Sequence, residues 1–175
     1  MLYADDYRSY ERSFSLLTQV VGRSGRGNDK GMAVIQTFTP ENLIISMASR
    51  QDYNTFYSNE IKVRKAMLYP PFADICLVGF VSQNREAAFK GARKFLELFT
   101  EEAKKNYPNM PLRILGPTPA LVVKISNKYR FKIIIKCKNN SEFRALLSKI
   151  LCEFGKSKGI SHKASIKNSR DVIVC

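Results

Sequence analysis

The sequence lacks the features that would place it in a membrane or around a structural metal. It has no run of about 18 apolar residues, so we expect no segment that spans a bilayer. Its first residues are polar and acidic, which is not the pattern of a signal peptide. The cysteines are scattered and form no C-x-x-C pair, whereas structural zinc sites usually need close pairs of ligands. We therefore expect a cytoplasmic chain with free thiols and no bound metal. The four cysteines are Cys76, Cys137, Cys152 and Cys175.

The sequence also lacks the segments with which an ATPase holds its nucleotide. It contains no G-x-x-x-x-G-K-[ST] loop and no acidic Mg²⁺-binding motif of the helicase kind. The backbone N–H groups of such a loop cradle the phosphates, and one or two arginines cannot replace them. We expect that this chain alone does not hydrolyse ATP.

Positive charge is abundant and unevenly distributed. The 29 Lys and Arg residues exceed the 15 Asp and Glu residues, for a net charge of +14. Residues 1–70 hold 9 basic and 7 acidic residues, whereas residues 71–175 hold 20 and 8. A compact domain this basic usually meets a polyanion, most often a nucleic acid. The alternative is a soluble basic surface without a specific partner, and composition does not separate DNA, RNA and acidic protein.

A pair of consecutive prolines in the segment Tyr69-Pro70-Pro71-Phe72 predicts a domain boundary, with domains at 1–69 and 70–175. Two prolines stop a helix, and the charge balance changes at the same place. Before the boundary, the pattern predicts a helix over 7–21, a Gly/Arg-rich loop over 22–31 and a buried strand over 32–38. A helix beginning at Pro40 and capped by Thr39, and another over 51–67, are expected to follow.

After the boundary, the pattern predicts helices on one face of a mainly antiparallel sheet, an α+β sandwich. Apolar residues at helical spacing predict helices over 84–106 and 141–155. The remaining segments read as strands, with a hairpin around Ser126-Asn127-Lys128. The expected strands cover 73–82, 112–115, 120–126, 129–138 and 170–174.

The segment from Gln19 to Gly27, QVVGRSGRG, carries the sharpest chemical motif. Two arginines three residues apart, Arg23 and Arg26, are separated by small residues where a helix meets a loop. Glycine allows close approach to a phosphate, and arginine brings a permanent charge with a planar fork. These are the requirements of an arginine finger that stabilises the γ-phosphate during hydrolysis. The alternative is a structural Arg/Gly loop that caps a helix or contacts nucleic acid.

A second candidate site is the alternation of residue types along 121–137. Odd positions are mostly apolar, including Leu121, Val123 and Ile125, and even positions are largely basic. Period-2 alternation predicts a core face and a basic face that suits a phosphate backbone. The alternative is an ordinary solvated strand face; Tyr129 either stacks on a base or packs at the sheet edge. The predicted DNA-binding residues are Lys124, Lys128, Arg130, Lys132 and Lys136.

These motifs resemble a known family. Q-x-x-G-R-x-G-R at 19–26 is similar to the sixth motif of superfamily 2 helicases. The segments YRSYER at 7–12, GMAVIQTF at 31–38, YPPF at 69–72 and LGPTPA at 115–120 resemble the bacterial primosomal protein N′ family. The likeness runs through nearly the whole chain. One departure is the end of the chain, where the family usually has an aspartate-rich turn around a proline and this sequence has no proline.

The resemblance implies a fragment of an ATP-dependent 3′-to-5′ DNA helicase that acts at stalled or forked DNA and starts primosome assembly for replication restart. Residues 1–69 would be an α/β remnant of the second helicase lobe and would donate Gln19, Arg23 and Arg26 to an ATP site. Residues 70–175 would hold DNA.

Several cofactors and partners follow from the same resemblance. The full-length parent would use ATP and Mg²⁺ and would carry zinc in a cysteine-rich module that this chain lacks. Its partners would be single-stranded and forked DNA, single-stranded DNA-binding protein, and primosome or helicase-loader proteins, without a membrane. A rival interpretation is a stand-alone, non-enzymatic nucleic-acid-binding module. The absence of the P-loop favours this interpretation.

Overall fold

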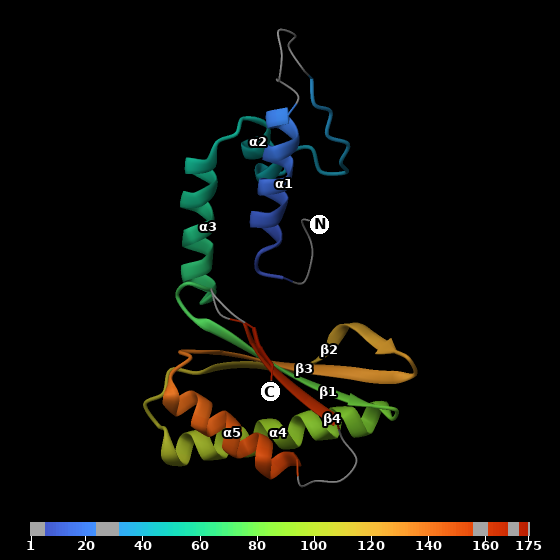
Figure 1. Cartoon of the computed structure of the whole chain (residues 1–175), viewed down its shortest axis with the longest axis vertical. Coiled ribbons are helices and arrows are strands. Elements are labelled where there is room, and N and C mark those ends of the chain that lie inside the picture. Colours follow the sequence, from blue (N-terminus) through green and yellow to red (C-terminus); the bar gives the residue numbers. More distant parts are fainter. Residues whose placement is uncertain (1–5, 24–31, 156–160, 168–171, 175) are drawn as a thin grey trace. The chain divides into compact units, whose positions relative to one another are not determined.

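The chain folds into two compact units, Met1–Met67 and Leu68–Cys175. The computed structural model, drawn in Figure 1, describes residues 6–23, 32–155, 161–167 and 172–174. Each unit has its own hydrophobic core.

The N-terminal unit is built from three helices. They are α1 (Ser9–Arg23), α2 (Leu43–Ser49) and α3 (Tyr53–Met67). The rings of Phe14 on α1 and Phe56 on α3 stack with their centroids 4.2 Å apart, and Met47 and Ala48 of α2 complete the cluster. The helices predicted over 7–21 and 51–67 are therefore present.

Two other predictions for this unit are wrong. The helix expected at Pro40 begins instead at Leu43, because the side chain of Asn42 accepts a hydrogen bond from the Ile44 N–H at 2.9 Å and caps it. The segment 32–38 is not a strand, and Met32 and Phe38 are exposed rather than buried. A strand needs a neighbouring strand for its backbone hydrogen bonds, and the described residues of this unit form only helices and loops.

An arginine joins the two longer helices of this unit. The guanidinium of Arg64 on α3 donates to Glu60 of the same helix and to Glu11 of α1, each at 2.9 Å. Burial lowers the pKa of Arg64, but the hydrogen bonds to Glu60 and Glu11 outweigh it and leave the pKa raised. The ion pair between Arg64 and Glu11 thus links α3 to α1.

The C-terminal unit contains an antiparallel sheet in the order β2-β3-β1-β4-β5. β1 is a central strand: it pairs with β3 from Asp74↔Cys137 to Ser82↔Tyr129, and with β4 on its other side. β4 was not predicted, because its short polar sequence, SHKASIK, shows no clear alternation. The strands are β1 (Asp74–Ser82), β2 (Arg113–Ile125), β3 (Lys128–Cys137), β4 (Ser161–Lys167) and β5 (Val172–Val174).

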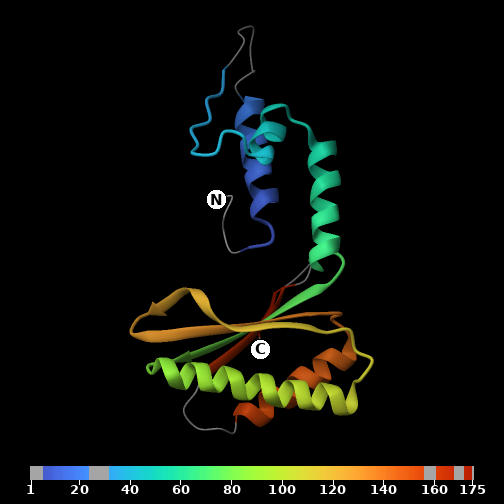
Figure 2. The same cartoon turned by 180° about the vertical axis from the view of Figure 1, so that it is seen from behind.

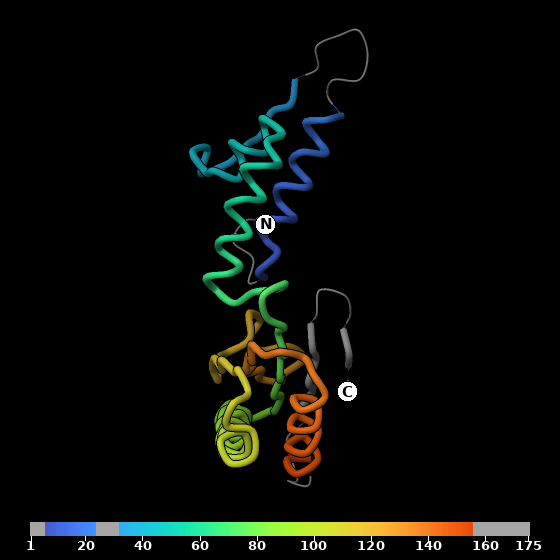
Figure 3. The backbone as a smooth tube through the Cα atoms, turned by 90° about the vertical axis from the view of Figure 1, so that its left-hand side faces the viewer, coloured from blue at the N-terminus to red at the C-terminus, as the bar shows by residue number. Residues whose placement is uncertain are grey.

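Two helices cover one face of this sheet, as Figures 2 and 3 show from two further directions. They are α4 (Arg85–Asn106), which Asn84 caps, and α5 (Ser141–Gly155), and both match their predicted ranges. The core between helices and sheet is rich in phenylalanine, and each of these rings is at most 1% exposed: Phe80, Phe95, Phe99, Phe143 and Phe154. The predicted α+β class is confirmed.

A tight turn joins β2 to β3. Ser126 and Asn127 have positive φ angles of 48° and 59°, the geometry of a two-residue type I′ turn. The predicted hairpin is therefore present. Its first strand is a single long one with two register irregularities, not the two short strands that were expected.

Gly116 sits at the first of these irregularities. Its φ is +105°, and a Cβ atom there would lie 2.9 Å from the carbonyl oxygen of Lys132 on the neighbouring strand. Only glycine combines this backbone conformation with such a close approach. The bend in β2 therefore depends on this residue.

We predict that Gly116→Ala lowers the free energy of unfolding by about 1–3 kcal/mol, because a non-glycine residue is strained at this φ and its methyl group meets β3. Urea unfolding followed by circular dichroism measures the loss. Gly22→Ala is the control: Gly22 is helical, and its added Cβ would lie 3.6 Å from the nearest atom, an ordinary contact. Equal losses in the two variants would contradict the assignment of strain to Gly116.

Candidate nucleic-acid interface

The face of the sheet opposite α4 and α5 carries a row of basic side chains. Along β3, Phe131, Ile133 and Ile135 are buried against the helices. Successive side chains of a strand point to opposite faces, so the residues between them lie on the face opposite α4 and α5. Lys128 there is exposed, and Arg130 and Lys132 are half-buried. We call Lys128, Arg130 and Lys132 the basic row.

The hairpin distributes its charges differently from the prediction. Lys124 pairs with Tyr129, and Ile125 pairs with Lys128. The expectation that all even positions share one face is therefore wrong, because the two-residue turn pairs odd positions with even ones. Lys124 lies on the opposite face to Lys128, with its Nζ atom 5.0 Å from the centroid of the Tyr129 ring.

The apolar residues near the turn are not in the core, as the alternation had suggested. Leu121, Val123 and Ile125 are 75%, 39% and 45% exposed. The pairing of β1 with β3 stops at Tyr129, so beyond that residue none of the described strands lies beside the β2–β3 hairpin. This end of the hairpin presents aliphatic side chains beside lysines.

The expectation that Lys136 is exposed is also wrong. Its relative exposure is 6%, and its Nζ atom lies 3.9 Å from the centroid of the Tyr69 ring. Burial, and then the charge of Arg113, lower the pKa of Lys136. The period of the strand placed this side chain on the correct face but gave no sign that Tyr69 covers it.

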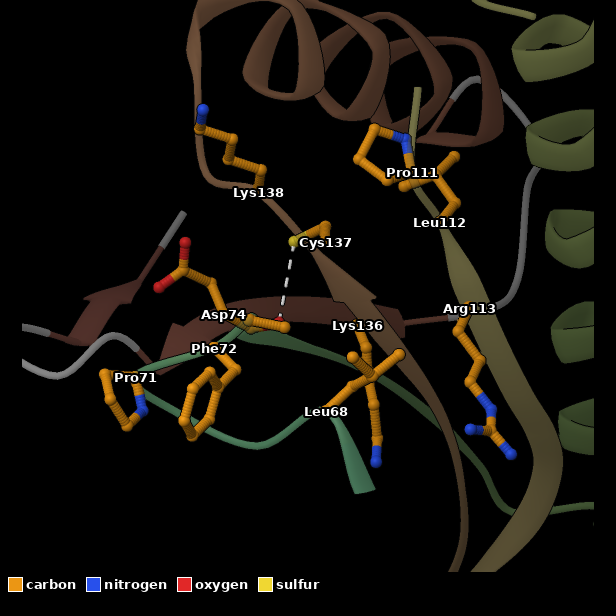
Figure 4. Close-up of a pocket in the computed structure, with 11 residues that line it drawn as sticks. Leu68, Pro71, Phe72, Asp74, Pro111, Leu112, Arg113, Lys136, Cys137 and Lys138 are labelled. Atoms are coloured by element: carbon orange, nitrogen blue, oxygen red, sulfur yellow. Dashed lines mark hydrogen bonds between the residues drawn. The ribbon is translucent and has the colours of Figure 1, made fainter. Parts of the chain in front are cut away.

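Lys136 and Arg113 line one cavity of about 610 Å³. The two residues are direct partners in the pairing of β2 with β3. Figure 4 shows both side chains pointing to the same side of the strands, whereas the Asp74 carboxylate and Lys138 point to the other. The apolar wall of the cavity includes Leu68, Pro71, Phe72, Pro111 and Leu112.

Sequence reasoning missed this cavity. The segment Tyr69 to Phe72 was recognised only as a boundary and a family motif. Arg113 lies beside Lys136 because of the register in which β2 pairs with β3, and the two irregularities in β2 shift that register between the turn and Arg113. No short sequence motif reveals such a register.

Cys137 ends β3 beside the cavity. Its thiol is 3% exposed and donates a hydrogen bond to the backbone oxygen of Asp74 at 3.9 Å, the dashed line in Figure 4. Burial, with smaller contributions from Cys76 and Asp74, raises the pKa of the Cys137 thiol to about 12. Cys76 is also a buried free thiol, and Cys152 is an exposed one.

We predict a specific alkaline destabilisation from Cys137. The unfolded chain ionises this thiol near pH 9.0, its ordinary pKa, whereas the folded chain keeps the proton until a pH of about 12. The stability gained from the neutral thiol is thus complete below pH 9 and is lost between about pH 9 and 12. The free energy of unfolding of the unmodified protein should fall relative to that of Cys137→Val over this range, measured by urea unfolding. Parallel curves for the two proteins would refute the assignment.

The arginine motif begins on α1. Gln19 and Arg23 are exposed and four residues apart, so both lie on one face of the helix. The Gln19 Nε2 atom is 3.4 Å from the Ser15 hydroxyl oxygen. Arg23 is the last residue of α1, which extends two residues past its predicted end, and Arg26 lies outside the described residues.

Neither a metal-binding cluster nor a membrane-spanning helix is found in the described part of the chain. No three His, Cys, Asp or Glu residues there come together as metal ligands would. No helix among those residues is both long and apolar enough to cross a bilayer.

Comparison with known proteins places the chain in a family. The family described as "Primosomal protein N C-terminal domain" matches residues 65–167, more than half of the chain. The chain belongs to this family. The match begins just before Tyr69 and runs through β4, so it includes the basic row and the cavity residues.

Relatives in the family are replication restart proteins. The chain is 35% identical to "Replication restart protein PriA" of Bacillus subtilis (strain 168) over 150 residues, which are 86% of this chain and 18% of the relative. The protein of that name from Borreliella burgdorferi is 38% identical over 144 residues, 82% of this chain and 21% of the relative. The chain therefore spans about a fifth of the length of these relatives.

A solved structure also aligns with part of the chain. It is the de novo designed protein Foldit4, with a TM-score of 0.40 and 15% identity, over 56% of this chain and 99% of its own.

Proposed function

We propose that the chain is the DNA-holding C-terminal part of an ATP-dependent 3′-to-5′ helicase that restarts replication at stalled or forked DNA. The basic row, which lies on the sheet face opposite α4 and α5, is the observation that carries this proposal. The name of the relatives, replication restart protein, gives the biological setting. The partners would be single-stranded and forked DNA, single-stranded DNA-binding protein, and primosome or helicase-loader proteins in the cytoplasm.

The basic row suits the backbone of a nucleic acid rather than its bases. Lys128, Arg130 and Lys132 follow one another at every second position of β3, so their charges form a line along the strand. Contacts from such a line reach phosphates, which carry no base sequence. Binding should therefore be insensitive to sequence and strongly dependent on salt.

The end of the hairpin adds a second kind of contact. Ile125 pairs with Lys128 and is 45% exposed, so it places an apolar side chain on the same face as the basic row. Apolar side chains of this kind insert beside unpaired bases. Single-stranded or forked DNA, which offers unpaired bases, should therefore bind better than a continuous duplex.

We predict that the double reversal Lys128→Glu/Lys132→Glu weakens binding to fluorescently labelled single-stranded DNA roughly tenfold at low salt. The slope of log affinity against log salt should become shallower by about 0.7 for each lost phosphate contact. Fluorescence anisotropy measures both quantities. The fold should survive, because Lys128 is exposed and Lys132 points away from the core.

The matched control is Lys104→Glu/Lys105→Glu. These residues are exposed in the last turn of α4, on the helix side of the sheet, and the change in net charge is the same. If both double variants lose affinity equally, the effect comes from overall charge and the basic row is not the interface.

The arginine motif would act in a longer protein. We propose that Arg23 and Arg26, with Gln19, stabilise the γ-phosphate of Mg-ATP held by a separate lobe with a P-loop. The position of Arg23 at the exposed end of α1 supports this role, since its side chain is free to reach a group outside the helix. Zinc would belong to a cysteine-rich module elsewhere in the same protein.

We predict that Arg26→Ala, made in a full-length protein of this family that carries this segment, lowers DNA-dependent ATP hydrolysis by about 10³–10⁵-fold, as loss of an arginine finger does. DNA binding should be nearly unchanged, and Arg23→Ala should also be severe. Steady-state ATPase assays measure the loss. The control is Arg12→Ala, an exposed arginine of α1 outside the motif. Normal hydrolysis by the Arg26 variant would mean that the loop is structural.

A further inference from the structure

The basic row ends beside an aliphatic residue. On β3, Ile134 follows Lys132 at the two-residue period of the strand, so its side chain lies on the face opposite α4 and α5. Ile134 pairs with Leu115 of β2 on one side and with Leu77 of β1 on the other. We call Leu115, Ile134 and Leu77 the aliphatic row. The residues next to them in sequence that pack in the core are Ile114, Ile133, Ile135, Cys76 and Val78.

The aliphatic row is accessible to a ligand. Leu115 is 39% exposed, and Ile134 and Leu77 are half-buried. Side chains at directly opposite positions of paired strands contact each other, so the row is one continuous apolar surface. Neighbouring strands lie about 4.8 Å apart, and the row therefore extends roughly 10 Å across the sheet.

The charges beside the aliphatic row indicate the kind of ligand. Lys132 and Arg130 lie on the same face as Ile134, roughly 7 and 14 Å from it along β3. A ligand that contacts both rows must carry negative charge on one part and an apolar surface on another. Single-stranded DNA has both, because its phosphates are anionic and every unpaired base has an apolar face.

A duplex could not use the aliphatic row. Its bases are paired and stacked, and their edges lie in grooves that admit a helix or a two-stranded ribbon rather than the face of a sheet. Apolar side chains reach bases that are unpaired or separated from their neighbours. The aliphatic row would therefore distinguish a single strand from a duplex, whereas contacts to phosphates alone would not.

An acidic protein segment also combines negative charge with apolar side chains. A stable protein interface, however, buries about 800 Å² on each partner around a well-packed apolar centre. Three aliphatic side chains, two of them already half-buried, are too few for such a centre. The size of the aliphatic row thus favours a nucleobase over a protein segment.

We propose that the aliphatic row is a base platform: the phosphates of single-stranded DNA lie along the basic row, and a base beyond Lys132 lies against Leu115 and Ile134. This inference rests on the proposed function, since it adds a base contact to the same DNA path. It assigns to Leu115 the selection of single-stranded over duplex DNA.

A tryptophan at position 115 tests the contact directly. The chain contains no tryptophan, so a single introduced indole reports only on its own surroundings. The Leu115→Trp variant is titrated with oligo-dT and with an abasic oligomer of equal length, which has the same phosphates but no bases. Oligo-dT should quench the tryptophan emission by stacking, and the abasic oligomer at saturation should not. Unchanged emission at saturating oligo-dT would overturn the proposal.

The matched control for this measurement is Phe89→Trp. Phe89 is 38% exposed on α4, on the other side of the sheet, and the change from one aromatic ring to another is conservative. Its emission should stay constant with both oligomers. Equal quenching in the two variants would mean that DNA does not select the aliphatic row, and the proposal would be wrong.

Affinities separate a base contact from a structural role of Leu115. Leu115→Ala should weaken binding of oligo-dT about fivefold, because less apolar surface leaves water when the base binds. Its affinity for the abasic oligomer should stay unchanged, and Leu115→Met should restore oligo-dT binding. Leu98→Ala, at a half-buried leucine of α4, is the control and should bind both oligomers normally. If Leu115→Ala weakens both oligomers equally in fluorescence anisotropy, the residue is structural and the base platform fails.

The remaining outcomes distinguish this inference from the proposed function. If neither oligomer binds the unmodified chain, both fail. If the two oligomers bind equally and Lys128→Glu/Lys132→Glu weakens both, the proposed function stands and the base platform fails. If an amphipathic peptide of Glu and Leu changes the emission of Leu115→Trp at a lower concentration than oligo-dT, the aliphatic row takes a protein segment and the base platform is wrong.

Discussion

The burial of one sheet face by a cluster of phenylalanines is the interaction on which the C-terminal unit depends. Phe80 on β1 contacts Phe95 of α4 and Phe154 of α5, with ring centroids 5.5 and 5.8 Å apart. Each fully buried ring contributes about 1.5–3 kcal/mol through the removal of apolar surface from water. Because a strand alternates its side chains, the same packing sends every second residue of β3 to the opposite face, where the lysines and Arg130 lie.

Much of this architecture could be predicted from the sequence, because it follows from periodicity and capping. The stripe that includes Phe95 and Phe99 defines α4, and the alternation around Phe131 defines β3, each within a residue or two of the bounds in the structure. Where local signals and tertiary contacts agree, as they do in these elements, the prediction needs no knowledge of the rest of the chain.

The errors arose where one segment depends on another that is distant in sequence. The residues 32–38 have the composition of a strand but no partner strand among the described residues, so they form no strand and alternate between exposed and half-buried. The face of the hairpin on which Lys124 or Lys128 lies depends on how the two strands pair across the turn, and not on whether the residue number is odd or even. Lys136 looks like a surface lysine in its own strand, and only the fold brings Tyr69 over it.

The two-residue turn at Ser126 and Asn127 constrains how the hairpin can change in evolution. Both residues have positive φ angles, so side-chain identity there is limited, but the length of the loop matters more. Insertion of a single residue at the turn would shift the register of one strand against the other and exchange the faces of the side chains that follow. A family that used this hairpin to hold DNA would therefore tolerate substitutions of its lysines more easily than insertions or deletions between them.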